Sequence, residues 1–211
     1  MSAEGGTVYV VDDEAAFRKA LMRLLRAGGF QVSAFASAHE FLASYQTDEV
    51  ACIVLDVAMP ELDGMALQRR LTESGALAPI VFLTGRGDIP MTAHAIKSGA
   101  VDFLTKPVDA ATLFRAVRLA LRRAATNKVA HSTMAALNAR YSSLTPRERE
   151  VMAKVVAGKL NKQIAADLEV AEQTIKIHRG RVMKKMGVES VADLVRAAER
   201  VTVQSSRASP A

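Results

Sequence analysis

Apolar residues in the first 120 positions fall into two alternating patterns. Short runs rich in β-branched residues predict strands at residues 8–11, 31–35, 51–56, 80–83 and 102–105. Apolar residues at helical spacing predict helices near residues 14–27, 38–45, 64–74, 89–98 and 109–123. Five strands that alternate with five helices are typical of an α/β doubly wound fold around a five-stranded parallel sheet.

From residue 144 onwards the chain shows only helical patterns. Thr145, Pro146 and Glu148 have the spacing of an N-cap, a first-turn proline and a capping-box acid, and Gly158 follows as a stop signal. Asn161 is placed to cap a second, short helix. We therefore expect an all-α, four-helix domain, whose later helices span residues 161–168, 171–186 and 191–201 before a frayed tail.

The stretch between these two parts contains neither glycine nor proline and is rich in alanine. Met134, Leu137 and Tyr141 recur there at helical spacing, which predicts a largely helical linker. The expected organisation is a first domain at residues 1–123, a linker at 124–141 and a second domain at 142–211.

The charge of the chain is unevenly distributed. Residues 1–123 carry 13 Lys and Arg and 14 Asp and Glu, a net charge of −1. Residues 124–211 carry 15 Lys and Arg and 8 Asp and Glu, a net charge of +7. The basic excess points to a polyanionic partner for the second domain, although charge alone does not separate nucleic acid from a membrane surface.

The location of the protein is indicated by what the sequence lacks. No apolar run approaches the roughly 20 residues of a transmembrane helix, and the N-terminus shows no signal-peptide pattern. We expect a cytoplasmic protein. Cys52, the single cysteine, lies in a strand-like run and is expected to be a core thiol.

Polar residues follow the predicted strands at the edge where open α/β sheets bind ligands. These residues are Asp12, Asp13, Asp56, Thr84 and Lys106. Clustered carboxylates need a cation, and oxygen ligands beside a phosphoryl group suit Mg²⁺. One carboxylate can attack a phosphoryl donor, while the lysine and hydroxyl bind the new phosphoryl oxygens. Any one aspartate alone would be interpreted as an ordinary turn residue; the whole set, in order, favours a phosphoryl site.

This set resembles the receiver domain of two-component response regulators, which has the flavodoxin-like fold, over residues 6–123. The matching segments are residues 10–14, 55–60, 84–88 and 103–107. The resemblance implies that Asp56 accepts phosphate from a histidine kinase. It also implies that Mg²⁺ is bound by Asp13, Asp56 and the backbone carbonyl of Ala58, with Asp12 acting mostly through water.

The same resemblance implies further roles near this pocket. Thr84 and Phe103 would form the switch pair, although Phe103 is also simply a core aromatic. Lys106 would bind the phosphate, with a cis bond to Pro107. A phosphatase of the haloacid-dehalogenase type uses the same groups, but it needs an acid two residues after the nucleophile. Ala58 stands there and cannot donate a proton.

The predicted helix at 171–186 has two distinct faces. Ile175, Val182 and Met186 form one apolar stripe. The opposite side presents Lys176, Ile177, Gly180, Arg181 and Lys184. With the preceding short helix this is a helix-turn-helix pattern, whose second helix enters the DNA major groove. A solvated charged face is the competing interpretation of this helix taken alone.

Residues 144–151, 161–165 and 174–179 resemble the LuxR-type helix-turn-helix, so the whole chain is similar to the FixJ/NarL family. The resemblance implies base contacts around Lys176, Ile177 and Gly180, with Thr174 in the same DNA-binding set. Phosphate contacts are implied for Lys162, Arg181 and Lys184. Arg179 lies nearer the buried side and is expected to pair internally with Glu150, and His178 to pack or to touch phosphate.

The expected function is therefore a phosphorylation-dependent, DNA-binding transcriptional regulator, not an enzyme. Phosphorylation of Asp56 should reorganise the surface of the fourth helix and fifth strand and favour receiver dimers. Two helix-turn-helix units would then reach half-sites about one DNA turn apart and act on RNA polymerase. The alternatives are an RNA-binding antiterminator with the same receiver and an adaptor that binds only proteins.

Overall fold

The computed structural model describes residues 6–45, 49–76, 78–85 and 95–207, with residues 202–207 described by their backbone alone. The chain divides into two compact units, Met1–Val129 and Ala130–Ala211. The expected domain boundaries at 123/124 and 141/142 remain predictions.

The first unit is built on a five-stranded parallel sheet in the order β2-β1-β3-β4-β5. Its strands are β1 (Thr7–Val11), β2 (Gln31–Phe35), β3 (Ala51–Asp56), β4 (Ile80–Thr84) and β5 (Asp102–Thr105). All residues of β3 and β4 are buried, because helices cover both faces of the sheet. The predicted doubly wound fold is confirmed.

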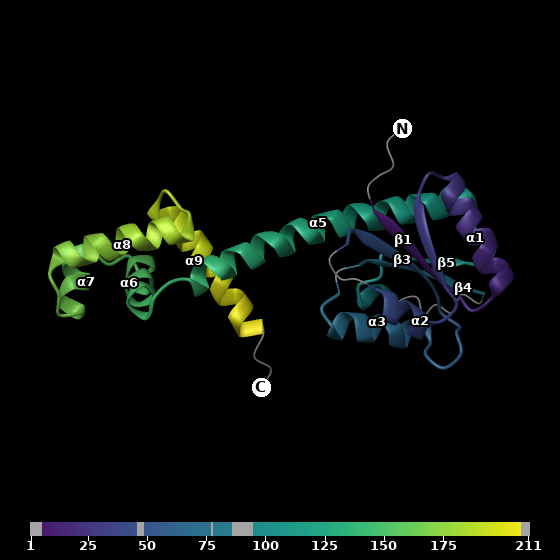
Figure 1. The fold of residues 1–211 in the computed structure, drawn as a ribbon, viewed down its shortest axis with the longest axis horizontal. Coiled ribbons are helices and arrows are strands. Elements are labelled where there is room, and N and C mark those ends of the chain that lie inside the picture. The colour runs from purple at the N-terminus through teal and green to yellow at the C-terminus, as the bar shows by residue number, and fades with distance from the viewer. Residues whose placement is uncertain (1–5, 46–48, 77, 86–94, 208–211) are drawn as a thin grey trace. The chain divides into compact units, whose positions relative to one another are not determined.

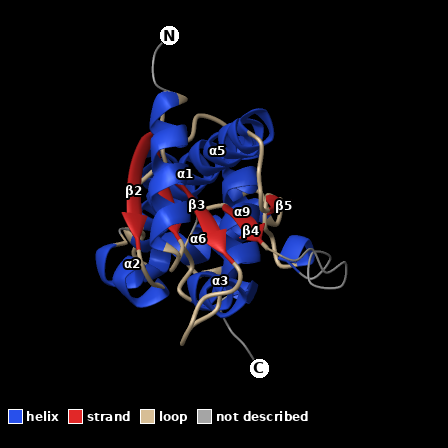
Figure 2. Ribbon diagram, turned by 90° about the vertical axis from the view of Figure 1, so that its right-hand side faces the viewer, coloured by secondary structure: helices blue, strands red, loops and turns tan. Residues whose placement is uncertain are grey.

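Helices of the described part of the chain cover both faces of this sheet (Figures 1 and 2). Helices α1 (Ala15–Ala27) and α5 (Ala110–Ser142) pack on one face. Helices α2 (Ala38–Ser44) and α3 (Gly64–Glu73) pack on the other. The helix expected at 89–98 lies mostly outside the described residues, of which 95–97 are helical.

The predicted linker could either extend the fifth helix or follow it, and helix α5 shows which of the two occurs. It is one helix, Ala110–Ser142, because no glycine or proline ends it near residue 123. Its first part contributes Leu113 and Val117 to the core of the first unit. Its last part packs Leu137 and Tyr141 against the core of the second unit. The predicted helical linker is thus confirmed as a continuation of α5.

The second unit consists of the end of α5 and helices α6 (Pro146–Val156), α7 (Asn161–Asp167), α8 (Glu172–Met186) and α9 (Val191–Arg207). The predicted capping box is confirmed: Thr145 Oγ1 accepts from Glu148 N at 3.3 Å, and Glu148 Oε2 accepts from Thr145 N at 2.8 Å. The expected end of the last helix at 201 was wrong, since α9 continues to Arg207.

The predicted cap of α7 was also wrong. Leu160, not Asn161, is its N-cap residue. The Leu160 amide donates to the side chain of Gln163 at 2.8 Å, so that Gln163 satisfies this amide in the way a capping-box residue does. The Asn161 side chain accepts instead from Arg179 Nη1 at 3.0 Å.

Among the described residues, no helix is long and apolar enough to span a membrane.

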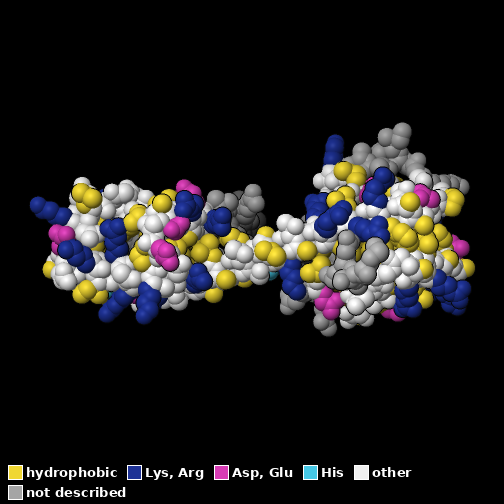
Figure 3. Space-filling model, turned by 90° about the horizontal axis from the view of Figure 1, so that it is seen from above, with side chains coloured by type: hydrophobic (Ala, Val, Ile, Leu, Met, Phe, Trp, Pro, Cys, Tyr) yellow, Lys and Arg dark blue, Asp and Glu magenta, His cyan; other side chains and the backbone are white. Residues whose placement is uncertain are grey.

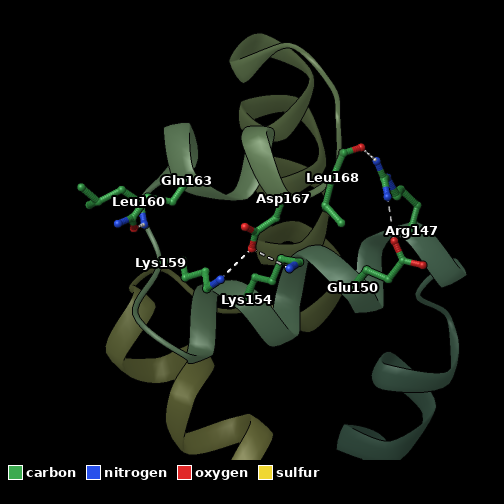
Figure 4. Close-up of polar contacts among 8 residues, drawn as sticks. All are labelled: Arg147, Glu150, Lys154, Lys159, Leu160, Gln163, Asp167 and Leu168. Atoms are coloured by element: carbon green, nitrogen blue, oxygen red, sulfur yellow. Dashed lines mark hydrogen bonds and ion pairs between the residues drawn. The ribbon is translucent and has the colours of Figure 1, made fainter.

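Ion pairs join α6 to α7 on the surface of this unit (Figure 4). Asp167 accepts from Lys154 at 2.7 Å and from Lys159 at 2.6 Å. Arg147 binds both Glu150, at 2.8 Å, and the carbonyl of Leu168, at 2.9 Å. These contacts fix the short α7 against α6 and occupy three of the basic side chains of the unit.

Candidate functional site

The three aspartates predicted from the sequence meet at the carboxyl edge of the sheet. Asp12 and Asp13 follow β1, and Asp56 ends β3, the neighbouring strand. One carboxylate oxygen from each lies within 4.8 Å of the others. Asp12 and Asp56 are buried, with 1% and 5% exposed, whereas Asp13 is exposed. The pocket therefore holds two enclosed carboxylates and one that is open to solvent.

Lys106 joins the two buried carboxylates. Its Nζ lies 2.7 Å from Asp12 Oδ2 and 2.9 Å from Asp56 Oδ2, and 4.2 Å from the centre of the Phe17 ring. Burial lowers the pKa of Lys106, but the hydrogen bonds and charges of Asp12 and Asp56 together outweigh burial and raise it. Removal from water raises the pKa of Asp12 despite its contact with Lys106. The lysine thus stays charged.

Backbone groups hold the remaining carboxylate oxygens of the pocket. Asp12 Oδ1 accepts from the Glu14 amide at 2.9 Å, and Asp56 Oδ1 accepts from the Ala58 amide at 3.3 Å. Gly64, the first residue of α3, lies so close to this strand end that a Cβ would be 2.4 Å from the carbonyl oxygen of Asp56. This close approach was not predicted from the sequence, and it lets α3 begin directly beside Asp56.

The expected switch residues lie on the next two strands. Thr84 ends β4 and is buried, and its carbonyl accepts from the Lys106 amide at 2.7 Å. Phe103, on β5, is half-buried and its ring centre lies 5.9 Å from that of Phe82. The Lys106–Pro107 bond is cis, as expected. The role of these residues as a switch stays a prediction.

The second candidate site is the exposed face of α8. Its buried residues are Ile175, Val182 and Met186, which confirms the predicted apolar stripe. Ile177 on the opposite face is 48% exposed. A Cβ at Gly180 would meet nothing within 4 Å, so no packing within the chain requires glycine there.

Most basic side chains of the second unit already have partners. Figure 3 shows Lys and Arg prominent on the visible face of this unit. Within the described side chains of residues 130–201, the Lys and Arg with no hydrogen bond, ion pair or ring contact are Lys162, Lys176, Arg181, Lys184 and Arg200. Four of these five are basic residues that the sequence assigns to DNA. Their charges remain available to an external anion.

Arg179 pairs internally, as expected, but with a different partner. It donates to Asn161 rather than to Glu150, and Glu150 is bound by Arg147 instead. His178 is half-buried, and its Nδ1 has no hydrogen-bond partner among the described residues.

A buried carboxylate lies beside the last turn of α8. Glu148 is 3% exposed and accepts from Lys185 Nζ at 2.7 Å as well as from the Thr145 amide. The hydrogen bond from Lys185 is the largest cause that lowers the pKa of Glu148 to about 2. This contact links the last turn of α8 to the first turn of α6.

Glu148 should therefore make the stability of this unit depend on pH. The stabilisation is present above pH 4.5, the ordinary pKa, and is lost as the pH falls towards about 2. Glu148→Gln keeps the cap and removes the charge, so we expect it to lower the free energy of unfolding at neutral pH by about 1 kcal/mol. Urea unfolding followed by the methyl NMR signals of Ile164 and Ile175 measures this. A difference from wild type that does not shrink below pH 4.5 would contradict the assignment.

Comparison with known proteins places both sites in one family. Residues 8–118 match the response regulator receiver domain, and residues 142–198 match the bacterial regulatory proteins of the luxR family. The chain belongs to the two-component response regulators that join a receiver to a LuxR-type DNA-binding domain, and it is a transcriptional regulator of the FixJ/NarL type.

Individual relatives match over nearly the whole chain. Response regulator protein TmoT of Ectopseudomonas mendocina is 45% identical over 201 residues, which cover 95% of this chain and 91% of TmoT. Transcriptional regulatory protein FixJ of Bradyrhizobium diazoefficiens is 40% identical, over 92% of this chain and 95% of FixJ. The solved structure of the response regulator StyR has a TM-score of 0.82 and 43% identity, over 92% of this chain and 98% of StyR.

Proposed function

We propose that Asp56 is the phosphoryl acceptor of this regulator and that its phosphorylation controls DNA binding through α8. The observation that carries this proposal is the bridge that Lys106 forms between Asp12 and Asp56. An oxygen of Asp56 attacks the phosphorus of a phosphohistidine on the sensor kinase. The new P–O bond forms as the P–N bond breaks, and the imidazole leaves with a proton. Lys106 and Thr84 then bind the phosphoryl oxygens.

The oxygen ligands of the pocket fit Mg²⁺. The carboxylates of Asp12, Asp13 and Asp56 provide the hard oxygen donors that this ion prefers, and their separation of up to 4.8 Å leaves room for bound water. Asp13, Asp56 and the carbonyl of Ala58 would hold the ion directly, and Asp12 through water. When bound, Mg²⁺ neutralises charge on the carboxylates and the incoming phosphoryl group. The protein accepts a phosphoryl group from the kinase and at most hydrolyses it slowly, so it is not an enzyme.

The proposed output of phosphorylation is a dimer. A phosphoryl group bound by Thr84 would move this residue and Phe103, and so reorganise the surface around β5. Receiver dimers would bring two helix-turn-helix units to adjacent half-sites, where the regulator contacts RNA polymerase. A regulator of chromosomal DNA with a histidine kinase as partner would work in the cytoplasm.

The proposed DNA contacts rest on the unpaired cations of α7 and α8. Base edges would be contacted from α8 by Lys176, Ile177 and Gly180, and Thr174, in the first turn of this helix, belongs to the same DNA-binding set. Phosphates would be contacted by Lys162, Arg181 and Lys184. The exposure of Ile177 and the open space at Gly180 support a close approach of α8 to the major groove.

Two lysines of α8 should behave differently when replaced by alanine. Lys184→Ala should lower the slope of log affinity against log salt by about one unit on every DNA sequence, because one phosphate contact is lost. Lys176→Ala should reduce the difference in binding free energy between specific and non-specific DNA by about 1–3 kcal/mol, if Lys176 donates to both O6 and N7 of a guanine. Salt-titrated fluorescence anisotropy on specific and random duplexes measures both.

The matched control is Arg200→Ala, which removes an equally unpaired cation from α9 rather than from α8. It should leave both quantities near those of wild type. If Lys176→Ala and Lys184→Ala give the same pattern, the division into base and phosphate contacts is wrong. If neither variant differs from Arg200→Ala, α8 is not the DNA-binding helix.

A further inference from the structure

The end of α5 contacts the end of α8 through one arginine. Arg140, two residues before Ser142 at the end of α5, donates from Nη1 to the carbonyl oxygen of Met186, the last residue of α8, at 3.2 Å. Carbonyls at a helix C-terminus carry partial negative charge and lack partners within the helix, so a cation there is stabilising. Within the second unit, the end of α5 therefore contacts the C-terminus of the helix proposed to read DNA.

Gly187 makes this contact possible. It follows α8 as a left-handed C-cap, with φ 65° and ψ 41°. A Cβ at this position would lie 2.6 Å from Arg140 Nη1 and 3.0 Å from its Cζ. Glycine thus serves two purposes here: it adopts the left-handed conformation without strain, and it leaves the space that the guanidinium occupies.

A second contact runs in the opposite direction across the same junction. Lys185, in the last turn of α8, donates from Nζ to the carbonyl oxygen of Ser143, just after α5, at 3.0 Å. Leu137 and Tyr141 of α5 pack against the same core as the buried stripe of α8. Two polar contacts in opposite directions, beside an apolar contact, restrict both sliding and rotation of α8 relative to the end of α5.

We infer that Arg140 is a positioning residue for DNA recognition. It fixes the rotation of α8 about its axis, so that the base-contacting side chains stay oriented towards the base edges. This inference rests on the proposed function, in which α8 reads DNA. A helix turns as a unit, so a rotation released at Met186 also displaces Lys176 and Ile177. Such a rotation affects contacts with base edges, which need exact geometry, more than contacts with phosphates, which are electrostatic.

The test uses the full chain and a duplex that the wild-type protein selects from a random-sequence pool. Arg140→Met keeps the apolar stem of the side chain and removes the guanidinium. We expect the ratio of specific to non-specific affinity to fall about threefold to tenfold, while the salt slope on random DNA stays unchanged. Circular dichroism at the assay temperature shows that each variant remains folded.

Arg149→Met is the matched control. Arg149 also supports the end of α5, since it donates to the Ser142 carbonyl at 3.1 Å and lies over the Tyr141 ring at 5.6 Å, but it makes no hydrogen bond or ion pair with the described residues of α8. It should leave the specificity ratio unchanged. A merely structural role of Arg140 would instead make the two variants alike, and that result would overturn the inference.

A second variant approaches the contact from the other side. Gly187→Asn tolerates the left-handed conformation, but its Cβ takes the space of the guanidinium. It should lower the specificity ratio about as much as Arg140→Met, and the double variant should lose no more than the larger single loss. Additive losses, or a wild-type ratio for Arg140→Met, would overturn the inference. If Lys176→Ala and Lys184→Ala bind DNA like wild type, the proposed function of α8 fails instead.

Discussion

Asp56→Asn should abolish the uptake of phosphate from acetyl phosphate in the presence of Mg²⁺. The variant keeps the size of the side chain but loses the nucleophilic carboxylate, one oxygen of which lies 2.9 Å from Lys106 Nζ. Wild-type protein should gain one phosphoryl group, which intact-protein mass spectrometry detects directly. A chelator of divalent cations should prevent the gain, because the clustered carboxylates need Mg²⁺ to bring in a charged donor.

Asp63→Asn is the matched control for this experiment. Asp63 is a nearby aspartate outside the pocket, where its side chain caps α3 by accepting from the Ala66 amide at 2.6 Å. Asparagine caps helices about equally well, so this variant should be phosphorylated like wild type. Equal labelling of Asp56→Asn, or labelling that a chelator does not affect, would show that Asp56 is not the acceptor.

The elements predicted best were those whose signal lies within a few neighbouring residues. Buried parallel strands appear as short apolar runs whatever their neighbours, and β2, β3 and β5 begin and end where the runs do. The capping box at Thr145 and Glu148 is equally local. The pocket was predictable because parallel strands place their carboxyl ends at one edge, so chain order alone brings Asp12, Asp56 and Lys106 together.

Features that depend on distant partners were missed. The side chain of Asn161 suits an N-cap, but Arg179, far along the chain, binds it instead. The same contact explains why Arg179 does not pair with Glu150. The approach of Gly64 to Asp56 and the contact of Arg140 with α8 are also tertiary. The end of this helix at residue 186 was predicted, but the space that Gly187 leaves for an arginine was not.

Phosphorylation should raise the affinity for DNA with two half-sites by about 10²–10⁴, and leave the affinity for a single half-site nearly unchanged. Joining two helix-turn-helix units in a dimer makes the second contact intramolecular, which produces a gain of this size without any new contact. The alternative is a receiver that covers α8 until it is phosphorylated. Residues 1–123 carry a net charge of −1 and residues 124–211 a net charge of +7. Long-range electrostatic attraction that would hold the receiver over α8 is therefore weak.

A single half-site separates the two mechanisms, because only one DNA-binding unit can occupy it. The fragment to compare with the unphosphorylated full chain begins at Ala130, since the compact C-terminal unit starts there. A fragment that began at Ser142 would lack Leu137 and Tyr141, which pack against the core of this unit. Similar half-site affinities of fragment and full chain support control by dimerisation. A fragment that binds about tenfold more tightly, a difference of about 1.4 kcal/mol, would show that the receiver masks α8.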